Sequence, residues 1–371
     1  MKTALLYHED LKRYSFGGNH PFQGNRFFLF WNFFQKTFSP FKDRFEIIKP
    51  EPAQDDLLKL VHTQDYIEAV KYASSGLHIS DIFNYFSLDN LDPLTYQLPK
   101  GIDKAARLIV GASVKAVSLV AEGKFKKAIG IGGGLHHAKP DFGEGFCVYN
   151  DVAVAIKYLK ENFGFKKILV LDTDAHAGNG TKEIFYKDNE VLFIDIHQDP
   201  QTIYPGSGFI WEIGEDKGEG FTVNIPLPRG ASNLAYKAVF EKIIVPLAEE
   251  FRPQIIIRYG GSDPHYLDEL TDLGLTLEGF KMIGDYVRKI AERVCQGRVV
   301  DLITSGYNLK VLPFAWGSLI CGLLDLDIDL NLEEKGIPSP ELGLKETEAI
   351  IGELKNLLEK YWKCFCYDGQ K

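Results

Sequence analysis

Short runs of β-branched and aliphatic residues alternate with longer amphipathic stretches along most of this chain. Such an alternation is typical of a parallel sheet whose faces are covered by helices. The short runs predict strands at Lys127–Gly132, Lys167–Asp172, Val191–His197, Phe221–Pro226, Gln254–Tyr259 and Val299–Thr304. The chain is therefore predicted to be an α/β protein with a mainly parallel central sheet.

Helices are expected where apolar residues recur three or four positions apart. Those stretches are Asp55–Ala73, Ala105–Ala121, Ala153–Asn162, Ala235–Glu250, Leu277–Arg293, Pro313–Leu324 and Lys345–Lys363. Ser232 and Thr276 are predicted to be N-caps of two of these helices. Residues His78–Lys100 have no clear period and predict a long loop. Because long loops are often functional, this one is expected to shape a substrate entrance.

The overall composition argues against several classes of protein. Lys and Arg number 42 against 51 Asp and Glu, a net charge of −9, whereas a nucleic-acid binder needs a basic face. No stretch has the apolar length of a membrane span, and the N-terminus does not resemble a signal peptide. The five cysteines are scattered, which suits a reducing compartment. We expect a cytoplasmic protein without nucleic-acid or membrane partners, built as a single domain over residues 1–371.

Side chains of the kind that bind ligands collect where the predicted strands end. The segment DTDAHAGNG (172–180) follows the second strand, and His136-His137 follow three glycines after the first. Asp263 lies just after the fifth strand, and Tyr307 just after the sixth. In parallel α/β sheets ligands bind beyond the carboxyl ends of the strands, so these residues are expected to form one site.

The pattern of acids and histidine after the second strand favours a metal site. If the strand runs on to His176, then Asp172, Asp174 and His176 point to one face, since strand side chains alternate. Catalytic Zn²⁺ needs a few such ligands and an open position, and Asp263 is the best third ligand by its position. Alternatively, the two aspartates cap a turn and His176 is a core residue. Burying unpaired carboxylates is costly, so the set as a whole favours a cation.

The paired histidines and the tyrosine add groups that can move protons. Adjacent imidazoles accept or donate protons near neutral pH, and glycines let the backbone approach a ligand closely. The Tyr307 hydroxyl could hydrogen-bond an oxyanion. A solvated turn with two incidental histidines, and a core tyrosine, remain the alternatives.

In this order, the motifs resemble those of the histone deacetylase superfamily, which includes acetoin-utilisation proteins and acetylpolyamine amidohydrolases. The resemblance runs from about His20 to about Leu309. It rests on GGGLHHAKPDFGEGFCVYND (132–151), DTDAHAGNGT (172–181), HQDPQTIYPGSG (197–208), GGSDP (260–264) and SGYNL (305–309). It implies an arginase-like three-layer α/β/α fold with a mainly parallel central sheet.

The resemblance also implies a role for each matching residue. The ligands of a single Zn²⁺ would be Asp174, His176 and Asp263. His136 matches the first catalytic histidine of the family, oriented by Asp172. His137 matches the second, the general base, and Asn179 stands at the place of its partner.

Further matches concern the substrate. Tyr307 matches the tyrosine that hydrogen-bonds the substrate carbonyl. The residues expected to bind the acyl-lysine chain or lie near the internal acetate exit are Gly145, Phe146, Tyr204 and Arg26. The resemblance thus covers both the chemistry and the tunnel.

Three departures from the family pattern carry expectations of their own. The family has a K⁺ site around Asp172, Asp174 and His176, and Asp195 stands where many relatives carry serine, so it could strengthen or alter that site. Ala177 replaces a histidine that is not a metal ligand. The glycine run usual before the tyrosine reads Ile-Thr-Ser-Gly (303–306) here, which leaves the position of the tyrosine open.

The resemblance implies a zinc-dependent amide hydrolase that removes acetyl or related acyl groups and releases acetate. Its substrate would be an acetylated lysine peptide or protein, or an acetylated small amine such as an acetylpolyamine. A dimanganese ureohydrolase is an alternative, although Gly178 stands where its Asp-x-His-x-Asp motif needs a carboxylate. A non-catalytic acyl-lysine binder is another, although every residue of the machinery is present. Asp/His/Asp ligands accept several divalent ions, so Zn²⁺ and Fe²⁺ are not distinguished.

Overall fold

The computed structural model describes residues 2–330 and 332–366. Its strands are β1 (Thr3–Leu6), β2 (Phe45–Ile48), β3 (Lys127–Ile131), β4 (Ile168–Asp172), β5 (Val191–Gln198), β6 (Thr222–Leu227), β7 (Ile255–Gly260) and β8 (Val299–Ile303). Its α-helices are α1 (Asn25–Thr37), α2 (Asp55–Leu58), α3 (Gln64–Ser74), α4 (Ile102–Ala121), α5 (Asp151–Phe163), α6 (Asn179–Phe185), α7 (Asn233–Val239), α8 (Val245–Phe251), α9 (Leu277–Val294), α10 (Leu312–Leu324) and α11 (Leu344–Leu358).

The strands form a sheet in the order β2-β1-β3-β8-β7-β4-β5-β6. The neighbours in β2-β1-β3 and in β7-β4-β5-β6 pair in parallel. In register, Asp172 at the end of β4 lies beside Asp195 of β5 and Tyr259 of β7. All six strands expected from the sequence are present to within about a residue at each end, and the predicted α/β class with a parallel sheet is confirmed.

The chain divides into two compact units, which interleave in sequence. The first consists of Met1–Phe165, Gly178–Ile184 and Val300–Thr304. The second consists of Lys166–Ala177, Phe185–Val299 and Ser305–Lys371. The single domain expected from the sequence stays a prediction.

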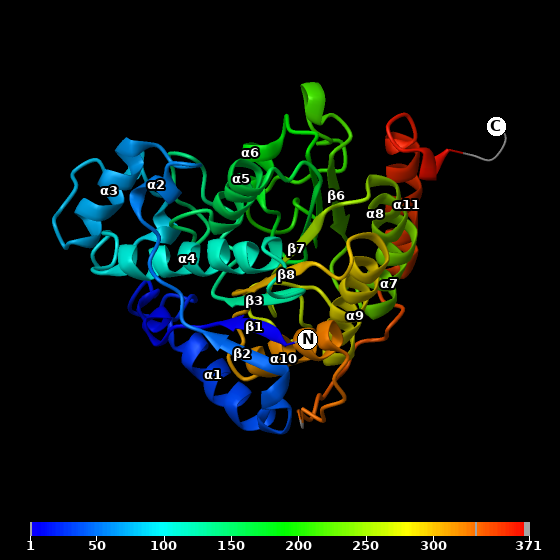
Figure 1. The fold of residues 1–371 in the computed structure, drawn as a ribbon, viewed down its shortest axis with the longest axis horizontal. Helices are drawn as coiled ribbons and strands as arrows, with labels where there is room; N and C mark the ends of the chain where they lie inside the picture. The colour runs from blue at the N-terminus through cyan, green and yellow to red at the C-terminus, as the bar shows by residue number, and fades with distance from the viewer. Residues whose placement is uncertain (1, 331, 367–371) are drawn as a thin grey trace. The chain divides into compact units, whose positions relative to one another are not determined.

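In the first unit, the long helix α4 packs on α5 and on β3, as Figure 1 shows in cyan and green. Helix α1 and strands β1 and β2 were not expected from the sequence. The α1 segment NRFFLFWNFFQKT is rich in aromatic residues, which are equally common in strands, although its buried residues Phe27, Phe30 and Phe34 recur at helical spacing. Its Phe34 stacks on Phe38 and meets Phe45 of β2 edge-on, with ring centroids 4.8 and 5.0 Å apart.

The predicted helix Asp55–Ala73 is wrong as one element, because the chain bends between α2 and α3. The backbone N–H of Thr63 donates to the Pro140 carbonyl, and the Thr63 hydroxyl accepts the N–H of Tyr66 as the N-cap of α3. His62 accepts the N–H of Asn150 at 3.0 Å. These contacts with residues far along the chain end the first helix and start the second.

In the second unit, α9 packs against α10 and α11 lies beside α7 (Figure 1). The predicted helix Ala235–Glu250 is interrupted by a π-helical turn over Phe240–Ile244. That turn lies just before Pro246. Proline has no backbone N–H to donate, and its ring clashes with the preceding turn of a helix. Ser232 and Thr276 occupy the predicted N-cap positions, but neither side chain makes the capping hydrogen bond. The Ser232 hydroxyl donates to the Gly274 carbonyl instead.

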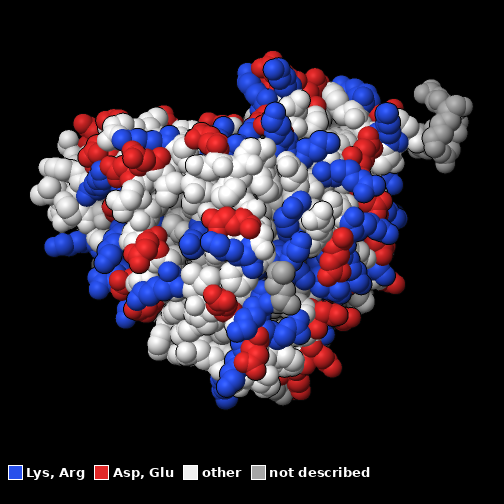
Figure 2. Space-filling model, in the orientation of Figure 1, with Lys and Arg blue, Asp and Glu red and all other residues white. Residues whose placement is uncertain are grey.

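Positive and negative side chains are interspersed on the face drawn in Figure 2. No large patch of one sign dominates that face. Among the described residues, no helix combines the length and the apolar character needed to cross a membrane.

Candidate active site

Three predicted metal ligands lie together in the second unit. Asp174, His176 and Asp263 are buried, and each offers a ligand atom within 4.8 Å of the others. His176 Nδ1 is 3.0 Å from Asp174 Oδ1 and 3.1 Å from Asp263 Oδ2. The convergence expected from the sequence is therefore present in the structure.

The route by which the residues converge differs from the expectation. Strand β4 ends at Asp172, so it does not continue to His176. Instead the chain turns twice, because the N–H of Asp174 donates to Asp172 Oδ1 and the N–H of His176 donates to Asp174 Oδ1, each at 2.9 Å. An aspartate side chain commonly stabilises such a turn by accepting the backbone N–H two residues further along the chain. The strand alternation argument for Asp172, Asp174 and His176 was wrong.

The charges of this cluster fit a divalent cation. Burial disfavours a protonated His176, but the hydrogen bonds and charges of Asp174 and Asp263 outweigh it and raise the pKa of His176 to about 10. Burial and the Asp174 charge raise the pKa of Asp263 well above its usual range. Two buried carboxylates whose ligand atoms lie within 4.8 Å of each other require a positive charge between them, either a proton or a metal ion. One nitrogen and several oxygen donors suit Zn²⁺ or Fe²⁺.

Tyr307 lies in the same unit, beside His176 of the cluster. Its ring meets the His176 ring edge-on, with centroids 6.3 Å apart. Its backbone N–H donates to Asp268 Oδ2 at 2.7 Å, and Asn308 Nδ2 donates to the Leu267 carbonyl at 2.7 Å. The loop that carries the tyrosine is thus bonded at two successive residues to the loop after β7.

The replaced glycine run is compatible with this position. Gly306, which is retained, has φ 124°, and a Cβ there would overlap Ser262 Oγ. Thr304 and Ser305, which stand in place of glycines, have no positive φ. Glycine is therefore kept at the position where the backbone requires it.

Asp268 was not identified from the sequence. It is partly buried, and burial raises its pKa to about 6, against the opposing effect of its backbone hydrogen bonds. It accepts the N–H groups of Leu270 and Tyr307. Nothing in the acidic segment 263–272 distinguishes this aspartate from its neighbours, so only the fold reveals it.

The paired histidines belong to the first unit. His136 and His137 are buried, with ring centroids 4.0 Å apart. His137 Nδ1 is 2.7 Å from Asn179 Oδ1, and Asn179 Nδ2 donates to Glu144 Oε1 at 2.8 Å. Because the amide oxygen only accepts, Nδ1 of His137 carries a proton, and a neutral ring keeps its lone pair on Nε2. Glu144, which the sequence reading did not single out, thereby sets the tautomer of His137.

A buried aspartate holds the loop in front of these histidines. Asp151 accepts the N–H groups of Gly134 and Leu135 and the hydroxyl of Ser113, at 3.1, 2.7 and 2.5 Å. Burial raises its pKa to about 6, although these donors favour the ionised form. The N–H of Thr181 donates to the His136 carbonyl at 2.9 Å. The loop is thus tied to α4, α5 and α6.

Of the predicted substrate-binding residues, Gly145 lies beside His137, and Phe146 follows it in the chain. A Cβ at Gly145 would overlap the His137 ring, so only glycine fits there. Phe146 adopts φ 64°, and its carbonyl accepts the Tyr14 hydroxyl at 2.7 Å. The N–H of Gly145 donates to Asp89 Oδ2 at 2.9 Å, so the long loop expected at an entrance does reach this segment.

The other two predicted substrate-binding residues, Arg26 and Tyr204, belong to different units. Arg26 is fully buried, with its guanidinium 3.7 Å from the centre of the Phe22 ring and bonded to the Thr304 carbonyl at 3.2 Å. Phe22 in turn contacts Phe146. Tyr204 belongs to the second unit and is 40% exposed.

Asp195 forms a buried ion pair with His197. Its Oδ1 is 2.8 Å from His197 Nδ1, and His197 Nε2 donates to the Gly208 carbonyl at 2.8 Å. Burial disfavours the charged ring, but Asp195 raises the pKa of His197. Since both ring nitrogens face acceptors, the geometry favours the imidazolium. A K⁺ site near Asp172, Asp174 and His176 stays a prediction.

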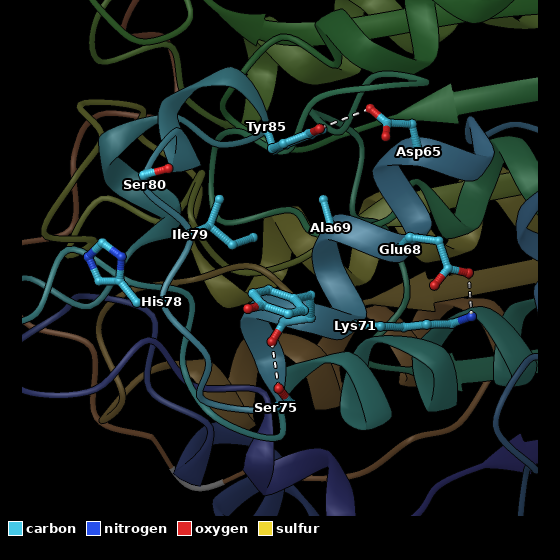
Figure 3. A pocket seen from close by; sticks show the side chains of 10 residues that line it. Asp65, Glu68, Ala69, Lys71, Ser75, His78, Ile79, Ser80 and Tyr85 are labelled. Carbon is cyan, nitrogen blue, oxygen red and sulfur yellow. Dashed lines mark hydrogen bonds and ion pairs between the residues drawn. The ribbon is translucent and has the colours of Figure 1, made fainter.

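A cavity of about 670 Å³ opens on helix α3 in the first unit (Figure 3). Several of its polar groups pair with one another. The Tyr85 hydroxyl donates to Asp65 at 2.9 Å, and Lys71 binds Glu68 at 3.0 Å. Groups that are already paired offer little to a ligand, so this cavity does not compete with the cluster around His176 as the candidate site.

An α/β protein with a candidate metal centre at its strand ends is the class that the fold and the site define. A family model described as the histone deacetylase domain matches residues 20–323. The acetoin utilization protein AcuC of Staphylococcus aureus (strain MSSA476) is 36% identical over 330 residues, which cover 88% of this chain and 83% of that protein.

Two further proteins are similar over nearly the whole chain. A probable deacetylase of Archaeoglobus fulgidus is 34% identical over 375 residues, covering 98% of this chain and all of that protein, 100%. The crystal structure of the HDA15 HD domain has a TM-score of 0.84 and 26% identity, and covers 98% of each chain. The chain belongs to the histone deacetylase family. The family and its named relatives support a deacetylase, a kind of hydrolase, and the resemblance seen in the motifs is confirmed.

Proposed function

We propose that this chain is a zinc-dependent deacetylase that hydrolyses N-acetyl-lysine or a similar acylated amine and releases acetate. The observation that carries the proposal is the buried cluster of Asp174, His176 and Asp263. Its two carboxylates and one imidazole are suitable ligands for a catalytic metal ion. Family membership supports the reaction, and the cluster supports the metal.

The residues of the chain have distinct roles in the proposed mechanism. A Zn²⁺ held by the cluster would supply Lewis-acid polarisation of the substrate carbonyl and of the attacking water. His137, with its Nδ1 proton held by Asn179, uses the Nε2 lone pair to take a proton from that water as it attacks the carbonyl carbon. The Tyr307 hydroxyl donates to the developing oxyanion.

Breakdown to products needs a proton on the leaving amine. In the proposal a protonated histidine of the pair donates it as the carbon–nitrogen bond breaks, leaving acetate and a free amine. His136, the first of the pair, supplies a second imidazole directly beside His137 for this proton transfer. Phe146 and the aromatic rings packed around it suit the apolar methylene stem of acetyl-lysine.

The decisive experiment measures acetate release and metal content together. We expect acetate release from a panel of acetylated peptides, acetylpolyamines and longer acyl-lysines, loss of activity on chelation, and recovery when zinc is added. Two manganese ions per chain would instead favour a ureohydrolase. Binding of acyl-lysine without acetate release, unchanged by a chelator, would favour a non-catalytic binder. The K⁺ site and the cytoplasmic location also stay predictions.

A further inference from the structure

Ser305 stands in the segment where the family usually carries glycine, and its side chain contacts a proposed metal ligand. The Ser305 hydroxyl donates to Asp263 Oδ1 at 2.6 Å. The two residues are 4% and 0% exposed. A hydroxyl-to-carboxylate distance of this length is typical of a hydrogen bond strengthened by the negative charge.

The backbone of Ser305 is held without help from its hydroxyl. Its carbonyl accepts the N–H of Ser262 at 2.9 Å and the indole N–H of Trp316 at 3.0 Å. A Cβ at Gly261 would overlap this carbonyl, so the two loops approach as closely as glycine allows. Removing the hydroxyl therefore leaves the bonds that fix the loop in place.

The contacts of Asp263 define which of its oxygens faces the cluster. Oδ1 accepts the Ser305 hydroxyl, whereas Oδ2 accepts the N–H of Ala175 at 3.2 Å and lies 3.1 Å from His176 Nδ1. The Asp263 carbonyl accepts the hydroxyl of Thr271. With donors on both oxygens, the carboxylate has one preferred rotation, and Oδ2 is the atom directed at the cluster.

We propose that Ser305 is a positioning residue that holds Asp263 with Oδ2 directed at the metal-binding position, and so tightens metal binding in this chain. The inference rests on the proposed function in one respect, that Asp174, His176 and Asp263 bind a divalent cation. Groups that hydrogen-bond a metal ligand orient it and raise the affinity of the site. A glycine at this position would leave Oδ1 without the hydroxyl.

The test is the zinc affinity of the full chain, measured by competition with a chromophoric chelator. Ser305→Ala and Ser305→Gly are each expected to weaken zinc binding about 10- to 100-fold, the usual effect of removing such a partner. Ser305→Thr keeps a hydroxyl and is expected to bind zinc more tightly than either. Ser232→Ala is the matched control, because that buried hydroxyl donates at 2.8 Å to a backbone carbonyl in the same unit and does not contact the cluster.

The outcomes separate the inference from the proposed function. Unchanged zinc affinity in the Ser305→Ala and Ser305→Gly variants overturns the positioning role, as does an equal loss in Ser232→Ala. Neither substitution adds a heavy atom, because the alanine methyl carbon is the Cβ that serine already has. If one of the two variants fails to fold, the other still supplies the measurement. A parent chain that binds zinc but releases no acetate overturns the proposed function alone. A parent chain that does not bind zinc overturns both.

Discussion

Asp151 and His137 in the first unit are stabilised differently from the cluster of Asp174, His176 and Asp263 in the second. In the second unit, Asp174 and Asp263 both lie beside Nδ1 of His176. Their two carboxylates are therefore close to one another, and their negative charges repel. In the first unit, Asp151 is surrounded by neutral hydrogen-bond donors, and His137 faces a neutral amide. The second unit's cluster therefore depends on a proton or a cation, whereas the first unit's groups are held by the protein itself. Loss of metal is expected to affect the two differently.

The largest expected effect separates catalysis from metal binding. His137→Ala removes the proposed base in the first unit and should lower kcat about 10²- to 10⁴-fold, the usual contribution of general-base catalysis. Zinc content should stay at one ion per chain, since the proposed ligands lie in the second unit. Acetate release and metal analysis on the same sample check this. Loss of zinc from the variant would contradict the assignment of the base to the first unit and of the metal ligands to the second.

Tyr307→Phe tests the second unit without changing its charges. Removal of the proposed oxyanion donor should lower kcat about 10²- to 10³-fold while zinc affinity remains that of the parent chain. Steady-state kinetics with one acetylated peptide, together with chelator competition, measure both quantities. Turnover equal to that of the parent would remove the phenol from the mechanism.

Asp268→Asn tests whether the tyrosine must be held by its backbone. The amide retains only one acceptor oxygen for the N–H groups of Leu270 and Tyr307, so the loop should shift. We expect kcat to fall about 10-fold, because small displacements of a catalytic group are costly. Zinc affinity should not change. An effect on zinc affinity alone would place Asp268 with the metal ligands instead.

Zinc uptake should release a proton in the second unit. Without a cation, His176 has a pKa of about 10 and is protonated at pH 7.5, whereas a metal ligand must be neutral. Asp263, whose pKa is also raised, contributes to the same count. Binding should therefore release at least one proton at pH 7.5, and zinc affinity should fall as the pH is lowered. Calorimetry in buffers with different ionisation enthalpies counts the protons. Uptake without proton release would show that the cluster is already deprotonated.

The smallest effect is expected from Ser113→Ala in the first unit. The substitution removes one donor to buried Asp151 and should reduce the free energy of unfolding by about 1–3 kcal/mol. Urea denaturation measures this loss. Zinc affinity should be unchanged, in contrast to Ser305→Ala, which removes a similar donor in the second unit. Equal zinc affinities for those two variants would erase the difference between the units.

Much of the fold was predictable because it is recorded in short stretches of sequence. The apolar runs that form β3 to β8 are bounded by turn residues, so their positions follow from local pattern. The convergence of Asp174, His176 and Asp263 was predictable because each follows a strand of one parallel sheet. The turns that shape the segment after Asp172 were not, because a carboxylate after a strand can continue it or end it.

Other features depend on contacts between distant residues. The break between α2 and α3 depends on Pro140 and Asn150, and the aromatic residues of α1 pack against Phe38 and Phe45, which follow it in the chain. The roles of Asp268 and Ser305 depend on hydrogen bonds that span about 40 residues of sequence. A local pattern carries no information about such partners.

By itself, the sequence determined the α/β class, the family and the residue types available for catalysis, since strand runs and motifs are local. Only the tertiary structure decided how those residues are held. It placed Glu144 behind Asn179 and thereby defined the tautomer of His137. It also brought the Ser305 hydroxyl onto Asp263. The physical reason is that hydrogen bonds of buried groups are selected by three-dimensional proximity, which packing of the whole chain creates.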